Sequence, residues 1–262
     1  MTSEIAQGLK QGVLIGLAVL VLVLPAPRDA LSGAEKGGKG PAGASWAGWV
    51  TEAEAALTAA PSAPRLVRRL DLGREAPSAD MRRLAQWIVD SADNGDRPFA
   101  IVDKRAARVY LFEPEGRLFA ATPVLLGYAR GDHTVAGIGD RPISAVRSHE
   151  RTTPAGRFVA HPGRNANQEQ VLWVDYDAAV SMHRLRATDP VERRVQRLAT
   201  PTAADNRISY GCINMPPAFF EKSFWPRFGK GSSVVYVLPE VQPLARIFPA
   251  LATQPIKVAD SR

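Results

Sequence analysis

After Pro98 the sequence becomes a series of short apolar segments with the length and pattern of β-strands. The first two segments are 99–103 (FAIVD) and 108–112 (RVYLF), and a third runs over 118–126. Short apolar runs separated by turn residues are typical of a meander of strands. This stretch therefore predicts a domain that is mainly β.

The strand pattern continues toward the C-terminus. A Pro-x-Gly turn at 152–159 leads into another strand, and 171–174 and 178–182 are two further short strands. Residues 233–238 (SVVYVL) form the last clear strand. The sequence shows no internal repeat.

One helix is expected just before the first strand. Ser78 or Asp80 can cap its N-terminus, and Leu84, Trp87 and Ile88 have the i, i+3, i+4 spacing of one helical face. The turn residues 94–96 (NGD) end it. Shorter helices are expected over 49–60, 189–198 and 244–251.

The N-terminus carries an apolar run followed by a linker. Residues 13–24 are twelve consecutive apolar or glycine positions. A helix that crosses a bilayer needs about 20 such residues, whereas the hydrophobic part of a signal peptide needs about 7–15. We therefore expect export, with an uncleaved membrane anchor as the alternative.

Four regions are expected along the chain. They are a signal peptide or short membrane anchor (1–30), an Ala/Gly/Pro-rich linker with amphipathic helices (31–96), the main domain (97–240) and a C-terminal tail (241–262). A linker rich in glycine and proline would hold the main domain away from a membrane or wall.

The net charge is +7 and the sequence pI is about 9.8, which favours an anionic partner. Nucleic acid, an acidic membrane surface and a bacterial cell wall all fit that charge. The arginines are scattered, however, and no nucleic-acid-reading motif accompanies them. We therefore expect no nucleic-acid partner.

Cys212 is the only cysteine, so the chain has no internal disulfide. A lone cysteine is often a small buried apolar residue, but this one lies in the sequence Ser-Tyr-Gly-Cys-Ile-Asn (209–214). The preceding glycine, Gly211, lets backbone come close to a group bound at the sulfur. A nearby histidine could activate the thiol, and the sequence by itself does not choose among His133, His149, His161 and His183.

Residues 99–238 resemble the L,D-transpeptidase catalytic domain, the YkuD or ErfK/YbiS group of bacterial cell-wall enzymes. The motifs that carry the resemblance are the opening strands, Thr153-Pro154-Ala155-Gly156-Arg157-Phe158 (T-P-x-G-x-F), Met182-His183, and 209–214, which matches S-H-G-C-[IV]-[NR] at five of six places. Tyr210 stands where the family usually has histidine. Arg184 stands where it usually has glycine or serine, and the segment 184–208 is longer than usual.

The resemblance implies a mainly β (α+β) fold, an L,D-transpeptidase-like β-sandwich with short helices. It implies that Cys212 is the nucleophile and that His183 activates it, oriented by the backbone C=O of Arg184. The N–H groups around Gly211 would stabilise an oxyanion. No cofactor is expected, and no H-E-x-x-H or other metal-ligand spacing is present.

Three neighbouring residues have roles that the sequence leaves open. Ser209 is expected to shape the loop by local hydrogen bonds. Asn214 either bonds the substrate or braces the loop. Tyr210 either packs as a half-buried aromatic or donates its hydroxyl to the substrate, because a phenol with a pKa near 10 is a poor base.

The segment before the cysteine motif is rich in arginine. It contains Arg184, Arg186, Arg193, Arg194, Arg197 and Arg207. Either it is a solvated helix face, or it is a lid whose planar guanidinium groups bind stem-peptide carboxylates. On the second hypothesis Arg207 is a substrate-binding residue.

The function implied by the resemblance is a peptidoglycan L,D-transpeptidase that forms 3-3 cross-links or attaches a protein to the wall. Its partners would be peptidoglycan stem peptides and, where a protein is attached, a wall-linked lipoprotein. It would act in the periplasm or cell envelope. One alternative is an L,D-carboxypeptidase or endopeptidase that hydrolyses stem peptides or lipoprotein links. Another is a non-catalytic cell-wall-binding domain.

Overall fold

The computed structural model describes residues 67–252, all of which belong to one compact unit. The predicted leader, most of the predicted linker, the helix predicted at 49–60 and the last ten residues lie outside the described residues. Within 67–252, no helix has both the length and the apolar character needed to cross a bilayer.

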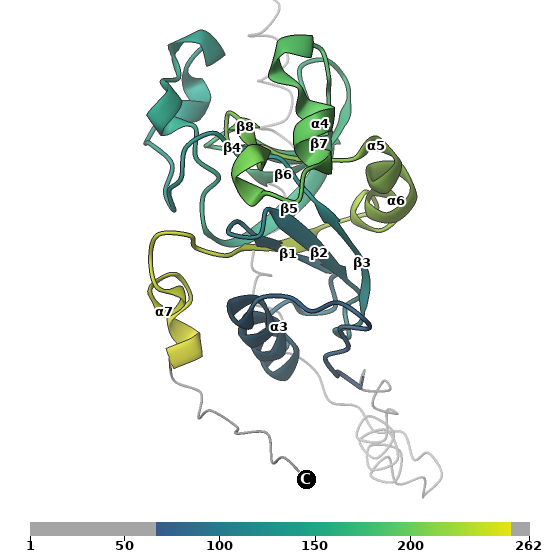
Figure 1. The fold of residues 1–262 in the computed structure, drawn as a ribbon. Coiled ribbons are helices and arrows are strands. Elements are labelled where there is room, and N and C mark those ends of the chain that lie inside the picture. Colours follow the sequence, from purple (N-terminus) through teal and green to yellow (C-terminus); the bar gives the residue numbers. More distant parts are fainter. Residues whose placement is uncertain (1–66, 253–262) are drawn as a thin grey trace, which may run out of the picture. The chain divides into compact units, whose positions relative to one another are not determined.

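Ten strands form the framework of the described chain (Figure 1). They are β1 (Phe99–Asp103), β2 (Arg108–Phe112), β3 (Leu118–Pro123), β4 (Leu126–Gly127), β5 (Gly156–Arg164), β6 (Gln170–Asp175), β7 (Val180–Arg184), β8 (Arg207–Ser209), β9 (Ile213–Met215) and β10 (Ser233–Val237). Eight strands form one sheet in the order β3-β2-β1-β10-β5-β6-β7-β9, and β4 pairs with β8. Only β1–β10, β7–β9 and β4–β8 are parallel among these pairs. The predicted class, mainly β with short helices, is confirmed.

The helices are short, apart from one. They are α3 (Ala79–Ser91), α4 (Arg194–Ala199), α5 (Pro217–Phe219), α6 (Trp225–Phe228) and α7 (Leu244–Ile247). A π-helical turn, Phe220–Phe224, joins α5 to α6. Turns of 3₁₀ helix lie at Ile138–Asp140, Ile143–Ala145, Ser148–Glu150, Pro190–Glu192, Ala203–Asn206 and Pro249–Ala252.

Both faces of the central strands are buried, because successive side chains of a strand point to opposite faces. In β1, Ala100 and Val102 belong to one apolar core, and Phe99 and Ile101 belong to a second. The first core also takes in side chains of β6, β7 and β9, so the sheet curves around it as a barrel-like sandwich. Three phenylalanines complete this core, Phe220 and Phe224 from the π-helical turn and Phe228 from α6.

Helix α3 covers the second core and has the N-cap that the sequence predicts. The Ser78 hydroxyl accepts a hydrogen bond from the Met81 N–H at 3.2 Å. The helix buries Met81, Leu84, Ala85, Ile88 and Val89. Leu244, Phe248 and Leu251, from the predicted tail, lie in the same core. The folded domain therefore extends beyond the predicted limits of 97 and 240 on both sides.

Three local predictions differ from the structure. The strand predicted at 118–126 is two strands, β3 and β4, which pair with different partners. The strand predicted at 178–182 begins only at Val180, because a turn ends at Ala179, which has a φ of 54°. Strands β8 and β9 and the helical turns over 217–228 were missed, since three-residue strands carry too short an alternation to recognise.

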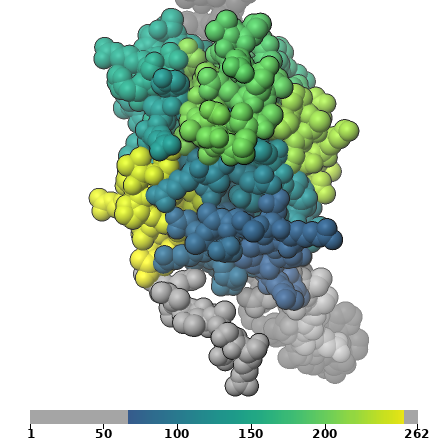
Figure 2. Space-filling view, in the orientation of Figure 1, coloured from purple at the N-terminus to yellow at the C-terminus, as the bar shows by residue number. Residues whose placement is uncertain are grey.

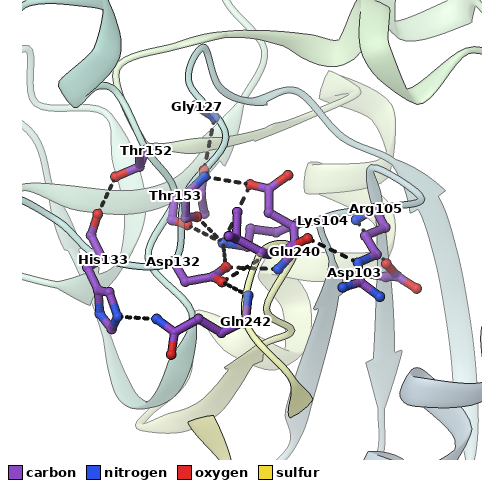
Figure 3. A network of polar contacts seen from close by, with 12 residues as sticks. Asp103, Lys104, Arg105, Gly127, Asp132, His133, Thr152, Thr153, Glu240 and Gln242 are labelled. Carbon is purple, nitrogen blue, oxygen red and sulfur yellow. Dashed lines mark hydrogen bonds and ion pairs between the residues drawn. The ribbon is translucent and has the colours of Figure 1, made fainter. Parts of the chain in front are cut away.

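A cluster of buried charges ties distant parts of the chain together (Figure 3). Lys104 Nζ lies 2.9 Å from Asp132 and 3.6 Å from Glu240, and all three side chains are nearly inaccessible. Nζ also donates to the Gly131 and Thr153 carbonyls at 2.5 and 2.8 Å. Since an uncompensated buried charge is strongly unfavourable, each member of the cluster requires the others.

Asp132 is ionised in this cluster. Burial raises the pKa of its carboxyl, but hydrogen bonds from the Gln242 N–H, the Lys104 ammonium and the Glu240 N–H outweigh it and lower the pKa to about 2. The stabilising effect is therefore present above the ordinary pKa near 4 and is lost as the pH falls through about 2.

We expect Asp132→Asn to lower the free energy of unfolding by about 2–5 kcal/mol at neutral pH, because the substitution leaves Lys104 without its nearest counter-charge. The difference from the wild type shrinks toward pH 2, where Asp132 of the wild type is itself becoming protonated. Urea unfolding at neutral and acidic pH measures both quantities.

The matched control is Asp96→Asn. Asp96 pairs with Arg68 at 3.0 Å, but its side chain is 84% exposed. Exposed pairs contribute at most about 1 kcal/mol. A loss for Asp132→Asn no larger than that of this control would contradict the prediction.

Candidate active site

The pairing of β7 with β9 brings the chemically important residues onto one face. In this parallel ladder Met182 is opposite Ile213 and His183 is opposite Asn214. Met182 and Ile213 are fully buried in the first core. Because side chains alternate along a strand, the neighbours of these two residues must point away from that core. The resulting opposite face carries Ser181, His183, Cys212 and Asn214.

The Cys212 thiol is half-buried at the start of β9. Its Sγ lies 3.7 Å from the Ser181 Oγ and 3.6 Å from the Ala179 carbonyl oxygen. The His183 side chain interacts with the thiol strongly enough to lower its pKa. Of the four histidines, His183 is therefore the one that the fold brings to the cysteine.

His183 is held by a hydrogen bond from Nδ1 to the Arg184 carbonyl oxygen at 2.8 Å. A carbonyl can only accept, so Nδ1 carries a proton and donates it. The other ring nitrogen, Nε2, then carries the lone pair that can accept a proton from the thiol. This is the orientation by the backbone of residue 184 that the resemblance implies, and it requires no aspartate.

The histidine and the cysteine shift each other's pKa in opposite directions. Burial raises the pKa of the Cys212 thiol, but the hydrogen bond with His183, its charge, and hydrogen bonds from Ser181 lower it below its ordinary value. Burial lowers the pKa of His183, but the interaction with the negatively charged Cys212 thiolate outweighs burial and raises that pKa. Both shifts favour a thiolate next to an imidazolium, which is the reactive form of a cysteine nucleophile.

The loop before the cysteine requires glycine. Gly211 has a φ of 129°, and a Cβ there would lie 2.8 Å from the Thr152 carbonyl oxygen. The Thr153 hydroxyl donates to the Gly211 carbonyl at 2.9 Å, and Lys104 donates to the Thr153 carbonyl at 2.8 Å. The buried charge cluster, which Figure 3 shows together with Thr153, therefore supports the loop that carries Cys212.

Ser209 shapes this loop through local hydrogen bonds, as the sequence predicts for this residue type. Its hydroxyl donates to the Cys212 carbonyl at 2.6 Å and accepts from the Gly211 N–H at 3.1 Å. The Gly211 N–H is thus already used. Among the described residues no acceptor lies against the Cys212 N–H, so that group is the available oxyanion donor.

Asn214 faces the histidine and is only 1% exposed. Its Nδ2 lies 3.2 Å from His183 Nε2, and its Oδ1 accepts from Arg194 Nη1 at 2.9 Å. These contacts brace the histidine. Of the two roles that the sequence leaves open for Asn214, the structure therefore favours bracing over a substrate contact.

Tyr210 lies at the surface, 38% exposed. The Arg151 guanidinium lies 3.9 Å from the centre of its ring, a cation–π contact. The ring is therefore partly exposed and packs against Arg151 at the surface.

The structure corrects the expectation for Arg207. Its guanidinium is 9% exposed and forms an ion pair with Glu240 at 2.5 Å, and it donates to the Lys104 carbonyl at 2.8 Å. It is a member of the buried charge cluster and is not presented to a substrate. Arg184 contributes its backbone carbonyl, while its side chain packs over Phe220 at 4.8 Å and pairs with Glu221 at 3.6 Å.

Most arginines of the segment 184–208 have partners within the protein. Arg186 pairs with Glu169 at 2.9 Å, Arg194 with Glu192 at 2.5 Å, and Arg197 donates to the Asp205 carbonyl at 3.1 Å. Within the described chain, only Arg193 of this group has no such partner. These contacts weaken the hypothesis of a lid that offers many free guanidinium groups. They hold the segment on the surface of the protein, where it is drawn in green in Figure 2.

Sequence reasoning missed Ser181 and did not single out Arg194. Ser181 could have been found, because a residue two positions before His183 in a strand shares its face. Arg194 could not, because its contact with Asn214 depends on how a long insert folds back. Within residues 67–252, no group of three or more His, Cys, Asp or Glu side chains is placed to hold a metal ion.

No protein-family profile and no curated protein matches the chain. Solved structures similar to it include an L,D-transpeptidase of Enterococcus faecium (16% identity, TM-score 0.30, 54% of this chain and 50% of that one). A second is an L,D-transpeptidase from Stackebrandtia nassauensis, with 15% identity and a TM-score of 0.33 over 62% of this chain and 68% of that one. A third is the helical cell shape determining protein Pgp2 from Campylobacter jejuni, with 16% identity and a TM-score of 0.36 over 65% of this chain and 60% of that one. The match spans half of the Enterococcus chain.

We expect His183→Gln to raise the pKa of the Cys212 thiol, because the substitution removes the hydrogen bond and the charge that lower it. Alkylation by iodoacetamide, followed by intact mass across the pH range, measures the thiolate. At pH 6 the rate should fall about tenfold or more, as expected when an activated thiol returns to an ordinary pKa near 8.5.

His161→Gln is the matched control, because His161 is an exposed histidine on β5 that does not contact the thiol. Its pH profile should equal that of the wild type. An unchanged profile in His183→Gln would show that His183 does not activate Cys212.

Proposed function

We propose that this protein is a peptidoglycan L,D-transpeptidase with Cys212 as its nucleophile. The observation that supports it most is the thiol–imidazole pair on the β7–β9 face, with His183 Nδ1 fixed on the Arg184 carbonyl. The sequence motif around Cys212 adds the substrate class through its resemblance to cell-wall enzymes.

In the first half of the proposed reaction, the Cys212 thiolate attacks the carbonyl of diaminopimelate in a tetrapeptide stem. The Cys212 N–H stabilises the oxyanion that forms. When the C–N bond breaks, the His183 imidazolium gives its proton to the departing amine of D-alanine. A thioester between Cys212 and the stem remains.

In the second half, an amine of an acceptor stem attacks the thioester carbonyl. His183, now neutral, takes the proton that this amine loses, and the C–S bond breaks to restore the Cys212 thiolate. The new amide is a 3-3 cross-link or, with a lysine of a lipoprotein as acceptor, a protein–wall link. Both halves use the thiol, the imidazole and a backbone N–H.

The tight loop fits the need for a fixed oxyanion donor. Thr153 bonds the Gly211 carbonyl and Ser209 bonds the Cys212 carbonyl, so the peptide unit that carries the Cys212 N–H is held from both sides. A donor held in place before the reaction needs no reorganisation as negative charge develops.

The proposed place of action is the bacterial envelope, where peptidoglycan lies. The basic charge of the chain, +7, suits an anionic wall surface. The apolar run at 13–24 would direct export. Association of the N-terminus with a membrane is part of this proposal.

Cys212→Ala should abolish covalent labelling by a carbapenem. The thiolate opens the lactam ring without a leaving group, so the wild type should gain the mass of the whole drug in an intact-mass spectrum. A variant that is still labelled would contradict the proposed nucleophile. The Cys212→Ser variant, close in volume, serves as a second test that does not depend on the packing of alanine.

Incubation of the wild type with purified disaccharide-tetrapeptides should give dimers with a 3-3 link, together with free D-alanine. Tripeptide and D-alanine without dimers would instead mean that water is the acceptor, the carboxypeptidase alternative. Absence of D-alanine in a protein that a carbapenem still labels would contradict this donor substrate.

A further inference from the structure

Both ring nitrogens of His183 are in contact with groups of fixed polarity. Nδ1 faces the Arg184 carbonyl at 2.8 Å, and Nε2 faces the Asn214 Nδ2 at 3.2 Å. An amide nitrogen can only donate. Asn214 therefore favours a His183 whose Nε2 carries no proton, which is the neutral imidazole.

Arg194 determines which end of the Asn214 amide faces the histidine. Its Nη1 donates to Asn214 Oδ1 at 2.9 Å. A guanidinium has donors only, so a rotation of the amide by half a turn would place the amide nitrogen against Arg194. Arg194 thereby keeps the oxygen of Asn214 toward itself and the nitrogen toward His183.

Arg194 and Asn214 are themselves held firmly. Glu192 binds the remaining side of the guanidinium through Nε and Nη2, at 2.5 and 3.3 Å, and the Arg194 side chain is only 14% exposed. The Asn214 backbone exchanges two hydrogen bonds with Leu125, at 2.8 and 2.9 Å. The amide can therefore neither turn nor move away at low cost in free energy.

When His183 accepts the thiol proton, Nε2–H faces the amide nitrogen, a contact between two donors. The contact disfavours the imidazolium. The other charged groups that act on His183 are the Cys212 thiolate, which favours the imidazolium, Arg186, which disfavours it, and Glu169, which pairs with Arg186. Asn214 and Arg194 therefore disfavour the imidazolium form of His183, whereas the Cys212 thiolate favours it.

We propose that Arg194 is a positioning residue that acts through Asn214 to keep His183 Nε2 as a hydrogen-bond acceptor. The consequence is a balance: the imidazolium forms when the thiolate is present, but it is a stronger acid than it would be without the amide. In the proposed reaction, that acidity assists proton return to the departing amine. The proton return to the amine rests on the proposed function. The effect of Arg194 and Asn214 on the protonation of His183 does not.

Arg194→Met tests the inference. Without the guanidinium, Asn214 can turn its Oδ1 toward Nε2–H and stabilise the imidazolium. The midpoint of the pH profile for Cys212 alkylation by iodoacetamide should then fall by about 0.5–1 pH unit, a three- to tenfold higher rate on the acidic limb, as expected for one hydrogen bond.

Two controls separate this effect from loss of charge. Arg193→Met removes a neighbouring, exposed guanidinium that has no contact with Asn214, and its profile should match the wild type. Arg194→Lys retains a donor and a charge, and should restore most of the wild-type profile. An equal shift in Arg193→Met, or no shift in a folded Arg194→Met, would overturn the inference.

A double variant tests the route through Asn214. In an Asn214→Ala background, Arg194→Met should cause no further shift, because there is no amide left to orient. A full shift in that background would mean that Arg194 acts directly by its charge, against the inference.

A direct titration gives a readout without the thiolate. In Cys212→Ala, the ¹⁵N shifts of the His183 ring should show a neutral, Nδ1-protonated imidazole, and adding Arg194→Met should raise the pKa of His183. Neither measurement uses peptidoglycan or a lactam, so the inference can fail while the proposed function stands, and the reverse.

Discussion

The parallel register of β7 and β9 is the constraint on which the candidate site depends. It places Met182 beside Ile213 in the core and, by alternation, places His183 beside Asn214 on the other face. A slip of one residue would turn the whole set over. The arrangement of the candidate site is thus fixed by the burial of two apolar side chains, Met182 and Ile213, which stabilises this register over its neighbours. The strand register by itself brings His183 and Cys212 to the same face.

The second support of the site comes from far along the chain. Lys104 follows β1, and its ammonium bonds the Thr153 carbonyl, while Thr153 in turn bonds the Gly211 carbonyl. The T-P-x-G turn is therefore a bridge between a buried charge and the loop before Cys212. A buried ion pair adds little net stability by comparison with an apolar pair. Here the charge cluster positions the backbone at Thr153 and Gly211 through directed hydrogen bonds, which a packed apolar group would not provide.

The sequence was sufficient to predict elements that depend on a local pattern. The strands at 99–103, 108–112 and 233–238 and the Ser78 cap were recognisable because alternation, turn residues and capping are local. The residues alone did not choose among the four histidines, and His183 was paired with Cys212 only through the resemblance. Arg207 was misinterpreted for a physical reason: an arginine near a motif looks the same whether it faces substrate or a buried Glu240. The partner lies more than thirty residues away in sequence, and only the fold reveals it.

The insert arginines show why a charge-rich segment need not be a lid. Glu192 occupies one side of the Arg194 guanidinium, and Asn214 occupies the other. Three of the five N–H donors of this guanidinium are therefore bound within the protein, and its orientation is transmitted to the amide that faces His183. The N–H donors of Arg194 attract the side-chain oxygen of Asn214. The Asn214 side-chain nitrogen then faces His183 and favours an unprotonated Nε2. The long segment before Cys212 therefore bears on how His183 is protonated, a property that Cys212 and His183 alone do not determine.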